Sequence, residues 1–357
     1  MTSTAAVQMP PVPATRFSLP AGSEATEPPE RRGIPRDGVR LLVARPAGIE
    51  HRRFRDLPTL LTPGGLVVVN TSATVPAALD ARLADGRAAT VHVSTPLERG
   101  DWVVEVRRQD GAGPDTGVGR GDRLELPGGL RLSLRAPYPD PAATGATRLW
   151  RARVTPRVIV NSYLARHGRP IRYGYLTGSP PLADYQTVYA AEPGSAEMAS
   201  AGRPFTADLL VRLMASGVPV SPVVLHAGVS SPERHEPPTP ERFRVPEVTA
   251  RLVAGTRAAG GRVVAVGTTV VRALETATGP DGVTRPAQGW TDLVLGPDRP
   301  AQAVTGMITG LHAPEASHLL LLEAVAGPDL VQAAYDAALE RAYRWHEFGD
   351  STLLLPH

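Results

Sequence analysis

The stretch from Gly267 to Arg272, Gly-Thr-Thr-Val-Val-Arg, carries residue types that can bind an anion. It follows an apolar β-branched run at 263–266, which predicts a buried strand. Gly267 allows a tight turn, and Thr268 and Thr269 are favourable residues at a helix start. Free backbone N–H groups there can hold a carboxylate or phosphate, and Arg272 can add a charge-assisted contact. An ordinary capped strand–helix turn has the same pattern, so both interpretations stay open.

The composition excludes several kinds of catalytic chemistry. The 357 residues contain no cysteine, which excludes thiol catalysis, thiolate metal sites and disulfides. All 38 basic residues are arginine, which excludes lysine Schiff bases, pyridoxal phosphate attachment and a P-loop lysine. The nine histidines are not spaced from one another or from acids as metal ligands usually are, so we expect no metal.

Length and charge indicate a folded protein of two domains. The chain is 42% hydrophobic and 20% charged, and it is long enough to bury a sizeable core. A net charge of +3 permits a polyanionic partner without demanding one. No apolar run approaches the length of a membrane span, and the N-terminus lacks the pattern of a signal peptide. We therefore expect a cytoplasmic protein with no membrane partner.

Strand and helix patterns alternate in two parts of the chain, which predicts an α/β domain. The strand patterns lie at 39–44, 66–70, 220–226, 262–266 and 293–295. The helix patterns lie at 54–61, 156–167, 206–217, 246–259, 268–276 and 330–345. Residues 1–16 are rich in Pro, Ala and Thr and are expected to form a disordered tail.

A different pattern occupies residues 78–155. Short alternating segments are separated there by Gly, Asp and Pro clusters, which predicts an antiparallel β-barrel or sandwich. The glycine-rich run 117–122 has no helix after it, so it is interpreted as a hairpin connection rather than a nucleotide site. We expect residues 17–77 and 156–357 to form the α/β domain and residues 78–155 to be a barrel inserted into it.

Six motifs in a fixed order resemble one enzyme family. They lie at 54–70, 185–190 (Tyr-Gln-Thr-Val-Tyr-Ala), 267–272, 290–293 (Trp-Thr-Asp-Leu), 307–314 and 343–350. Together they resemble the S-adenosylmethionine:tRNA ribosyltransferase-isomerases of queuosine biosynthesis, from about residue 17 to the end of the chain. The resemblance implies an α/β fold with an inserted antiparallel β-barrel domain.

The resemblance also implies an activity. Members of that family transfer the ribosyl part of S-adenosylmethionine to a 7-aminomethyl-7-deazaguanine base in a tRNA anticodon and rearrange it, releasing adenine and methionine. S-adenosylmethionine is then the co-substrate and the tRNA anticodon loop the partner, for a monomer or homodimer. Such chemistry needs a base near the acidic carbon beside the sulfonium, an anion site for the methionine carboxylate, and hydrogen bonds to the departing adenine.

The family motifs supply the candidate site residues. His312 is a candidate base, Asp350 a candidate partner for a ribose hydroxyl or the aminomethyl cation, and His226 a third catalytic candidate. Substrate-binding candidates are Tyr185, Gln186, Thr187, Tyr189, Gly202, Gly267, Thr268, Thr269, Arg272, Pro314, Tyr343 and Gly349. For several of these a structural role is equally open: His226 as a core histidine, the two tyrosines at 185 and 189 as packed rings, and Asp350 as a loop acid.

Three loops depart from the family pattern. Residues 70–74 are Asn-Thr-Ser-Ala-Thr where the family has Asn-Asp-Thr-Arg-Val, and Pro204 replaces a histidine. Segment 225–232 keeps only Leu225, His226 and Gly228 of its motif. These losses would weaken recognition of RNA phosphates and bases. Two alternatives follow: a diverged relative that uses S-adenosylmethionine with an unidentified small-molecule acceptor, and a non-catalytic binding protein.

Overall fold

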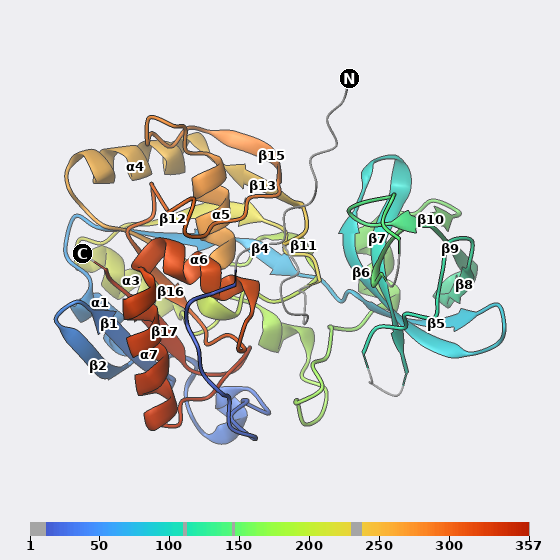
Figure 1. The fold of residues 1–357 in the computed structure, drawn as a ribbon, viewed down its shortest axis with the longest axis horizontal. Coiled ribbons are helices and arrows are strands. Elements are labelled where there is room, and N and C mark those ends of the chain that lie inside the picture. The colour runs from blue at the N-terminus through green and yellow to red at the C-terminus, as the bar shows by residue number, and fades with distance from the viewer. Residues whose placement is uncertain (1–11, 110–112, 145–146, 230–237, 357) are drawn as a thin grey trace.

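A layered α/β body and a separate barrel make up the molecule (Figure 1). The computed structural model describes residues 12–109, 113–144, 147–229 and 238–356. The predicted fold class is confirmed: a mixed α/β sheet carries a closed antiparallel barrel inserted after its third strand in chain order.

A nine-stranded sheet forms the centre of the α/β body, in the order β15-β13-β12-β3-β14-β16-β17-β1-β2. The strands are β1 (Arg40–Arg45), β2 (Gly48–Arg53), β3 (Leu66–Asn70), β12 (Val220–Leu225), β13 (Glu241–Val245), β14 (Val263–Val266), β15 (Ala287–Thr291), β16 (Gly306–Thr309) and β17 (Ser351–Leu354). Strands β12, β3, β14 and β16 are parallel neighbours. Their carboxyl ends therefore meet along one edge, the usual ligand-binding place of such sheets.

Helices cover both faces of this sheet, which explains why its central strands are almost wholly apolar. In β3, Leu66 and Val68 face one hydrophobic core while Val67 and Val69 face the other, as the two-residue period of a strand requires. Helices α4 (Glu247–Ala258), α5 (Thr268–Thr276), α6 (Ser317–Ala326) and α7 (Pro328–Glu340) pack on the first face. Helices α1 (Leu57–Leu60) and α3 (Ala207–Ala215) pack on the second.

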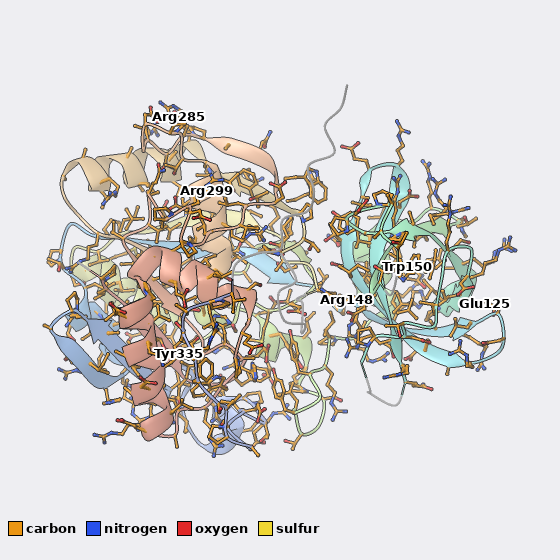
Figure 2. The ribbon with its side chains drawn as sticks, in the orientation of Figure 1. Glu125, Arg148, Trp150, Arg285, Arg299 and Tyr335 are labelled. Carbon is orange, nitrogen blue, oxygen red and sulfur yellow. The ribbon has the colours of Figure 1, made fainter. Side chains whose placement is uncertain are left out.

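The barrel closes in the order β10-β7-β6-β5-β8-β9 around its own apolar core. Its strands are β5 (Ala78–Leu83), β6 (Ala88–Pro96), β7 (Asp101–Arg108), β8 (Arg123–Leu126), β9 (Leu130–Pro137) and β10 (Leu149–Thr155). Helix α2 (Val160–His167) packs against it through Tyr163, whose hydroxyl donates to the Pro127 carbonyl at 2.6 Å. Trp150 fills part of the interior and Arg148 lies just before β10 (Figure 2).

A small parallel pair, β4 (Ser72–Thr74) and β11 (Glu192–Ser195), lies between the two bodies (Figure 1). The loop after β12 also reaches the barrel, because the Val229 N–H donates to the Ser94 hydroxyl at 2.9 Å and the Val229 side chain joins the barrel core. The carboxyl edge of the sheet therefore faces the side where the barrel is attached.

Several element boundaries differ from the sequence patterns. Residues 293–295 are not a strand; the neighbouring strand is β15, and the leucines at 293 and 295 instead turn inward to the core. The last helix ends at Glu340 rather than at 345, and the segment that follows is held by Asp350, which bonds to Arg344 and to Arg40 of β1. Helix α6 escapes prediction because its run 319–322 is four leucines without periodicity.

The N-terminal segment is ordered earlier than expected. For residues 1–11 the expectation of a disordered tail falls outside the described residues. From Ala14 onward the expectation is wrong, because the buried Glu323 carboxylate accepts hydrogen bonds from the N–H and the hydroxyl of Thr15, both at 2.7 Å. The Arg16 N–H then donates a hydrogen bond to the Gln332 side chain on α7 at 2.8 Å. In the described part of the chain, no helix has the length and apolar character needed to cross a membrane.

Candidate active site

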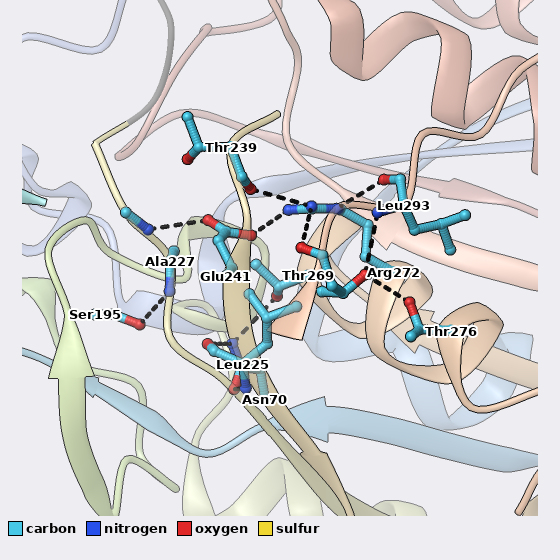
Figure 3. Close-up of polar contacts among 12 residues, drawn as sticks. Asn70, Ser195, Leu225, Ala227, Thr239, Glu241, Thr269, Arg272, Thr276 and Leu293 are labelled. Atoms are coloured by element: carbon cyan, nitrogen blue, oxygen red, sulfur yellow. Dashed lines mark hydrogen bonds and ion pairs between the residues drawn. The ribbon is translucent and has the colours of Figure 1, made fainter. Parts of the chain in front are cut away.

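Asn70 joins three elements at the carboxyl end of β3. Its side-chain oxygen accepts hydrogen bonds from the backbone N–H groups of Ser72 and Leu225, both at 3.0 Å. Its amide nitrogen donates to the Leu225 carbonyl at 2.8 Å and to the Thr269 hydroxyl at 3.2 Å (Figure 3). Asn70 is only 2% exposed, so a residue lacking either the donor or the acceptor would leave buried backbone groups unpaired. The ends of β3 and β12 and the start of α5 are therefore held together.

The turn between β14 and α5 presents backbone N–H groups to this edge. Gly267 has φ 89° and ψ 159°, a combination that glycine adopts and other residues avoid. Its N–H donates to the Ile308 carbonyl at 2.8 Å, which ties the turn to β16. No described side chain caps α5, and Thr268 and Thr269 are half-buried. The geometry is compatible with the anion site expected there.

Arg272 points away from that edge into the protein. Its guanidinium forms a buried ion pair with Glu241 and donates to the carbonyls of Leu293 and Thr291, both at 3.1 Å, and of Thr239 at 3.3 Å (Figure 3). Burial raises the pKa of the Glu241 carboxyl, although Arg272 and the Gly228 N–H act in the opposite direction. This arrangement corrects the anion contact expected of Arg272, because the guanidinium holds β13 and its flanking loops onto α5.

His226 lies in a hydrogen-bonded cluster beneath β4 and β11. Its Nδ1 is 2.8 Å from the Ser72 hydroxyl, which is 2.7 Å from the Ser195 hydroxyl, and its Nε2 is 3.7 Å from a Glu192 oxygen. A Cβ atom at Gly194 would collide with the imidazole ring, so this glycine permits the close approach. Burial is the main cause that lowers the pKa of His226, and nearby arginines add to it, so the ring is neutral near pH 7.

His312 is placed directly after the carboxyl end of β16. Its Nε2 is 2.9 Å from the Thr309 hydroxyl, and its ring stacks on His318 with centroids 4.6 Å apart and planes 1° apart. Its N–H donates to the Tyr335 hydroxyl, and its carbonyl accepts from the Trp345 indole, both at 3.1 Å. Burial, followed by the repulsion of His318 and His346, holds the pKa of His312 well below its usual range. The ring is a neutral imidazole that can accept a proton.

Asp350 joins β1 to the segment before β17. One carboxylate oxygen accepts from the Arg40 N–H at 2.8 Å; the other accepts from the Arg40 Nε at 2.9 Å and the Arg344 N–H at 2.8 Å. Arg40 also lies 4.2 Å over the Tyr343 ring, whose hydroxyl is 2.9 Å from the His51 Nδ1. Asp350 and Tyr343 thus have protein partners that stabilise the sheet edge, and a contact of either residue with a substrate stays a prediction.

The Tyr-Gln-Thr segment is packed into the protein. Gln186 makes a two-way contact with Thr74, accepting from its N–H at 3.0 Å and donating to its carbonyl at 2.8 Å. Tyr185 is 3% exposed and meets the Phe348 ring edge-on. A Cβ atom at Gly202 would overlap the Tyr189 hydroxyl. The packed-ring interpretation therefore replaces base stacking for both tyrosines, and Thr187 between them is likewise buried.

A pocket opens where β16 ends and β1 and β17 begin. It is lined by residues 346–351 together with Pro29, Arg36, Val39, Ser200, Arg203, Pro204 and Gly310. Gly349 and Asp350 line it, whereas Pro314 lies in a separate hollow beside residues 15–18. Within the described ranges, no group of three or more His, Asp or Glu side chains is placed to hold a metal ion.

The chain matches the model of the queuosine biosynthesis protein family over residues 13–354. It belongs to this family. Among curated members, the S-adenosylmethionine:tRNA ribosyltransferase-isomerase of Symbiobacterium thermophilum is 36% identical over 95% of this chain and 98% of the relative. That of Anaeromyxobacter dehalogenans is 37% identical over 95% and 97%. The crystal structure of S-adenosylmethionine tRNA ribosyltransferase from Thermotoga maritima is 32% identical, covers 95% of this chain and 99% of its own, and has a TM-score of 0.52.

The queuosine-family motifs thus fall into two groups in space. His226, His312 and the turn at Gly267 follow the carboxyl ends of β12, β16 and β14, and Asn70 at the end of β3 bonds to Leu225 and Thr269. Residues of the 185–190 and 343–350 motifs pack within the protein, where Gln186 holds Thr74 and Asp350 holds Arg40. Sequence reasoning missed Asn70, and it missed Glu347, which lines the pocket and carries a buried oxygen with no hydrogen-bond partner. The 343–350 motif contains two acids, Glu347 and Asp350, and the sequence alone does not distinguish the paired one from the unpaired one.

Proposed function

We propose that this chain is an S-adenosylmethionine-dependent tRNA ribosyltransferase-isomerase. It transfers the ribosyl moiety of S-adenosylmethionine to a 7-deazaguanine base in tRNA, rearranges it, and releases adenine and methionine. The observation that carries the proposal is identity of more than a third with relatives of that name, over nearly the full length of both chains. Retention of both the α/β body and the barrel supports the family reaction over a small-molecule acceptor or a loss of catalysis.

We assign S-adenosylmethionine to the carboxyl edge of β3, β14 and β16. The helix start at Gly267, Thr268 and Thr269 would hold the methionine carboxylate, because backbone N–H groups and the helix dipole favour an anion there. The hydrogen bond from Asn70 to Thr269 supports this role, since it fixes the helix start relative to β3. Arg272 contributes indirectly by holding β13 against α5.

His312 is the proposed base that removes a proton from the carbon beside the sulfonium. A neutral imidazole is required for that step, and the lowered pKa of His312 supplies it near pH 7. The Thr309 hydroxyl, 2.9 Å from Nε2, orients the ring. His226 is the second candidate, and its contact with Ser72 and Glu192 suits a hydrogen-bonding role toward the acceptor. A tRNA acceptor makes the cytoplasm the expected compartment.

The test is product release from defined substrates. The purified protein is incubated with S-adenosylmethionine and tRNA that carries 7-aminomethyl-7-deazaguanine, and free adenine, free methionine and the modified nucleoside are quantified by chromatography and mass spectrometry. We expect all three products together, and none when tRNA is omitted. Binding of S-adenosylmethionine without any adenine release would support the non-catalytic alternative. Adenine release with a free deazapurine, but not with tRNA, would support the small-molecule acceptor.

A further inference from the structure

Glu347 lies in a tight turn between α7 and β17. The turn closes with a hydrogen bond from the Gly349 N–H to the His346 carbonyl at 2.9 Å. His346 has φ 66°, an uncommon left-handed conformation for a non-glycine residue, and its ring stacks on Tyr175 at 5.1 Å. A Cβ atom at Gly349 would overlap the Arg344 carbonyl. The backbone on both sides of Glu347 is therefore held in place.

The Glu347 carboxyl reaches the pocket with one oxygen unpaired. Its Oε2 atom is buried and accepts no hydrogen bond, and it is the one such atom among the described residues that line the pocket. Burying a carboxylate oxygen without a hydrogen-bond donor costs free energy. A ligand that supplies a donor to this oxygen would remove that cost.

The other charged groups of the pocket already have partners within the protein. Arg36 and Arg203 both bind Glu30, at 3.2 and 3.0 Å. Asp350 is held by Arg40. Among these charged side chains of the pocket, Glu347 is thus the one with an oxygen that has no partner within the protein.

We propose that the Glu347 carboxylate binds a primary ammonium group of a substrate in this pocket. An ammonium group supplies both a positive charge and up to three N–H donors, whereas a sulfonium supplies charge without a donor. This inference rests on the proposed function, because that function brings two primary amines to the site. One is the α-ammonium of S-adenosylmethionine, and the other is the aminomethyl group of the acceptor base.

The protonation behaviour of the site agrees with this assignment. Burial raises the pKa of Glu347 to about 7, so the unliganded carboxyl is partly protonated at neutral pH. An ammonium partner favours the ionised form, so its binding strengthens as pH rises through 7. Of the facing groups, burial raises the pKa of Tyr173 and lowers that of His346, so neither changes charge as the pH rises through 7. The charged side chains of Arg36, Arg203 and Asp350 are paired within the protein.

The test compares wild type with Glu347→Gln by isothermal titration calorimetry. One arm uses S-adenosylmethionine and its analogue without the α-amino group. The other uses tRNA with 7-aminomethyl-7-deazaguanine and tRNA with guanine at the same position. We expect about 10- to 100-fold weaker binding of one amine-bearing ligand to the variant, the typical value of a charged hydrogen bond, with unchanged binding of its amine-free analogue. The arm that responds identifies the amine.

Two controls separate the possible failures. Glu340→Gln removes an exposed carboxylate at the end of α7 and is expected to bind like wild type. Glu347→Gln is expected to melt no lower than wild type, because it removes an unpaired buried charge. Equal affinity of Glu347→Gln and wild type for both amines overturns the inference, as does an equal loss for the amine-free ligands or an absence of wild-type binding to both. Adenine release by wild type is scored separately and tests the proposed function alone.

Discussion

Two acids three residues apart have opposite environments at the scale of single residues. Asp350 receives three donors from Arg40 and Arg344, whereas Glu347 keeps a buried oxygen without one. The first arrangement stabilises the fold, because each carboxylate oxygen accepts at least one hydrogen bond. The second has a cost in the free protein that a ligand can relieve. Both side chains are carboxylic acids, so their chemistry alone does not distinguish the two roles.

Asp350→Asn should destabilise the protein without a specific effect on chemistry. The amide loses the charge that pairs with Arg40, which we expect to cost about 3 kcal/mol of unfolding free energy. Urea denaturation measures this loss, and adenine release per folded molecule should stay within a few-fold of wild type. An unchanged urea midpoint together with abolished turnover would contradict the structural role and return Asp350 to the catalytic group.

His318 should make stability depend on pH. Burial lowers the pKa of its imidazole from 6.5 to about 4, so the unfolded chain binds the proton first as pH falls. Stability is then lost progressively between pH 6.5 and 4, by about 3 kcal/mol if this group acted alone. Melting temperature should fall less steeply over this range in His318→Phe, which keeps a ring against His312. An identical pH profile for the two proteins would contradict the buried neutral state.

At the scale of elements, helix α5 is held at both ends by different means. Its start is fixed by Gly267 and by the hydrogen bond from Asn70, and its middle by the ion pair of Arg272 with Glu241. Later in the helix, Glu275 accepts the N–H groups of residues 302–304. These contacts determine where the free N–H groups of the helix start lie relative to β3 and β16.

Breaking the Arg272–Glu241 pair on one side should cost more than removing both charges. Arg272→Met leaves the buried Glu241 carboxylate unpaired and is expected to lose about 3–5 kcal/mol of stability. The double variant with Glu241→Met should recover part of that loss, and chemical denaturation of the four proteins of the cycle measures the coupling. If the stability losses of the two single variants add exactly in the double variant, the ion pair does not contribute to holding α5.

At the scale of the whole molecule, the edge of the sheet faces the side where the barrel is attached. The β4–β11 pair and the contact of Val229 with Ser94 join the two bodies there.

Affinity for tRNA should fall steeply with salt. Contacts between arginines and RNA phosphates release counterions, so the logarithm of the affinity should fall linearly with the logarithm of the salt concentration, with a slope of about −0.7 per phosphate contact on single-stranded RNA. Filter binding or fluorescence anisotropy between roughly 50 and 200 mM salt measures the slope. Salt-independent tRNA binding would argue against phosphate contacts and would favour a small-molecule acceptor.

The sequence by itself determined the fold class, the family and the places of the site motifs. Apolar runs such as 66–69 and 263–266 are legible because a buried parallel strand needs them on both faces. The period change after Gly267 indicates the helix start for a similarly local reason, and the alternating segments of 78–155 indicate the barrel. Each of these signals depends on neighbours within a few residues along the chain.

Only the tertiary structure decided which polar residues remain for a substrate. Two of the three donors to Asp350 come from Arg40, 310 residues away in sequence, and the acceptors of Arg272 come from 19 to 33 residues away. Whether a charge is paired depends on partners that folding brings together, and the residue type does not predict those partners. For that reason Arg272 belongs to the framework of the expected site, Asp350 lines the pocket with its charge already paired, and Glu347 has the unpaired carboxylate oxygen of the pocket.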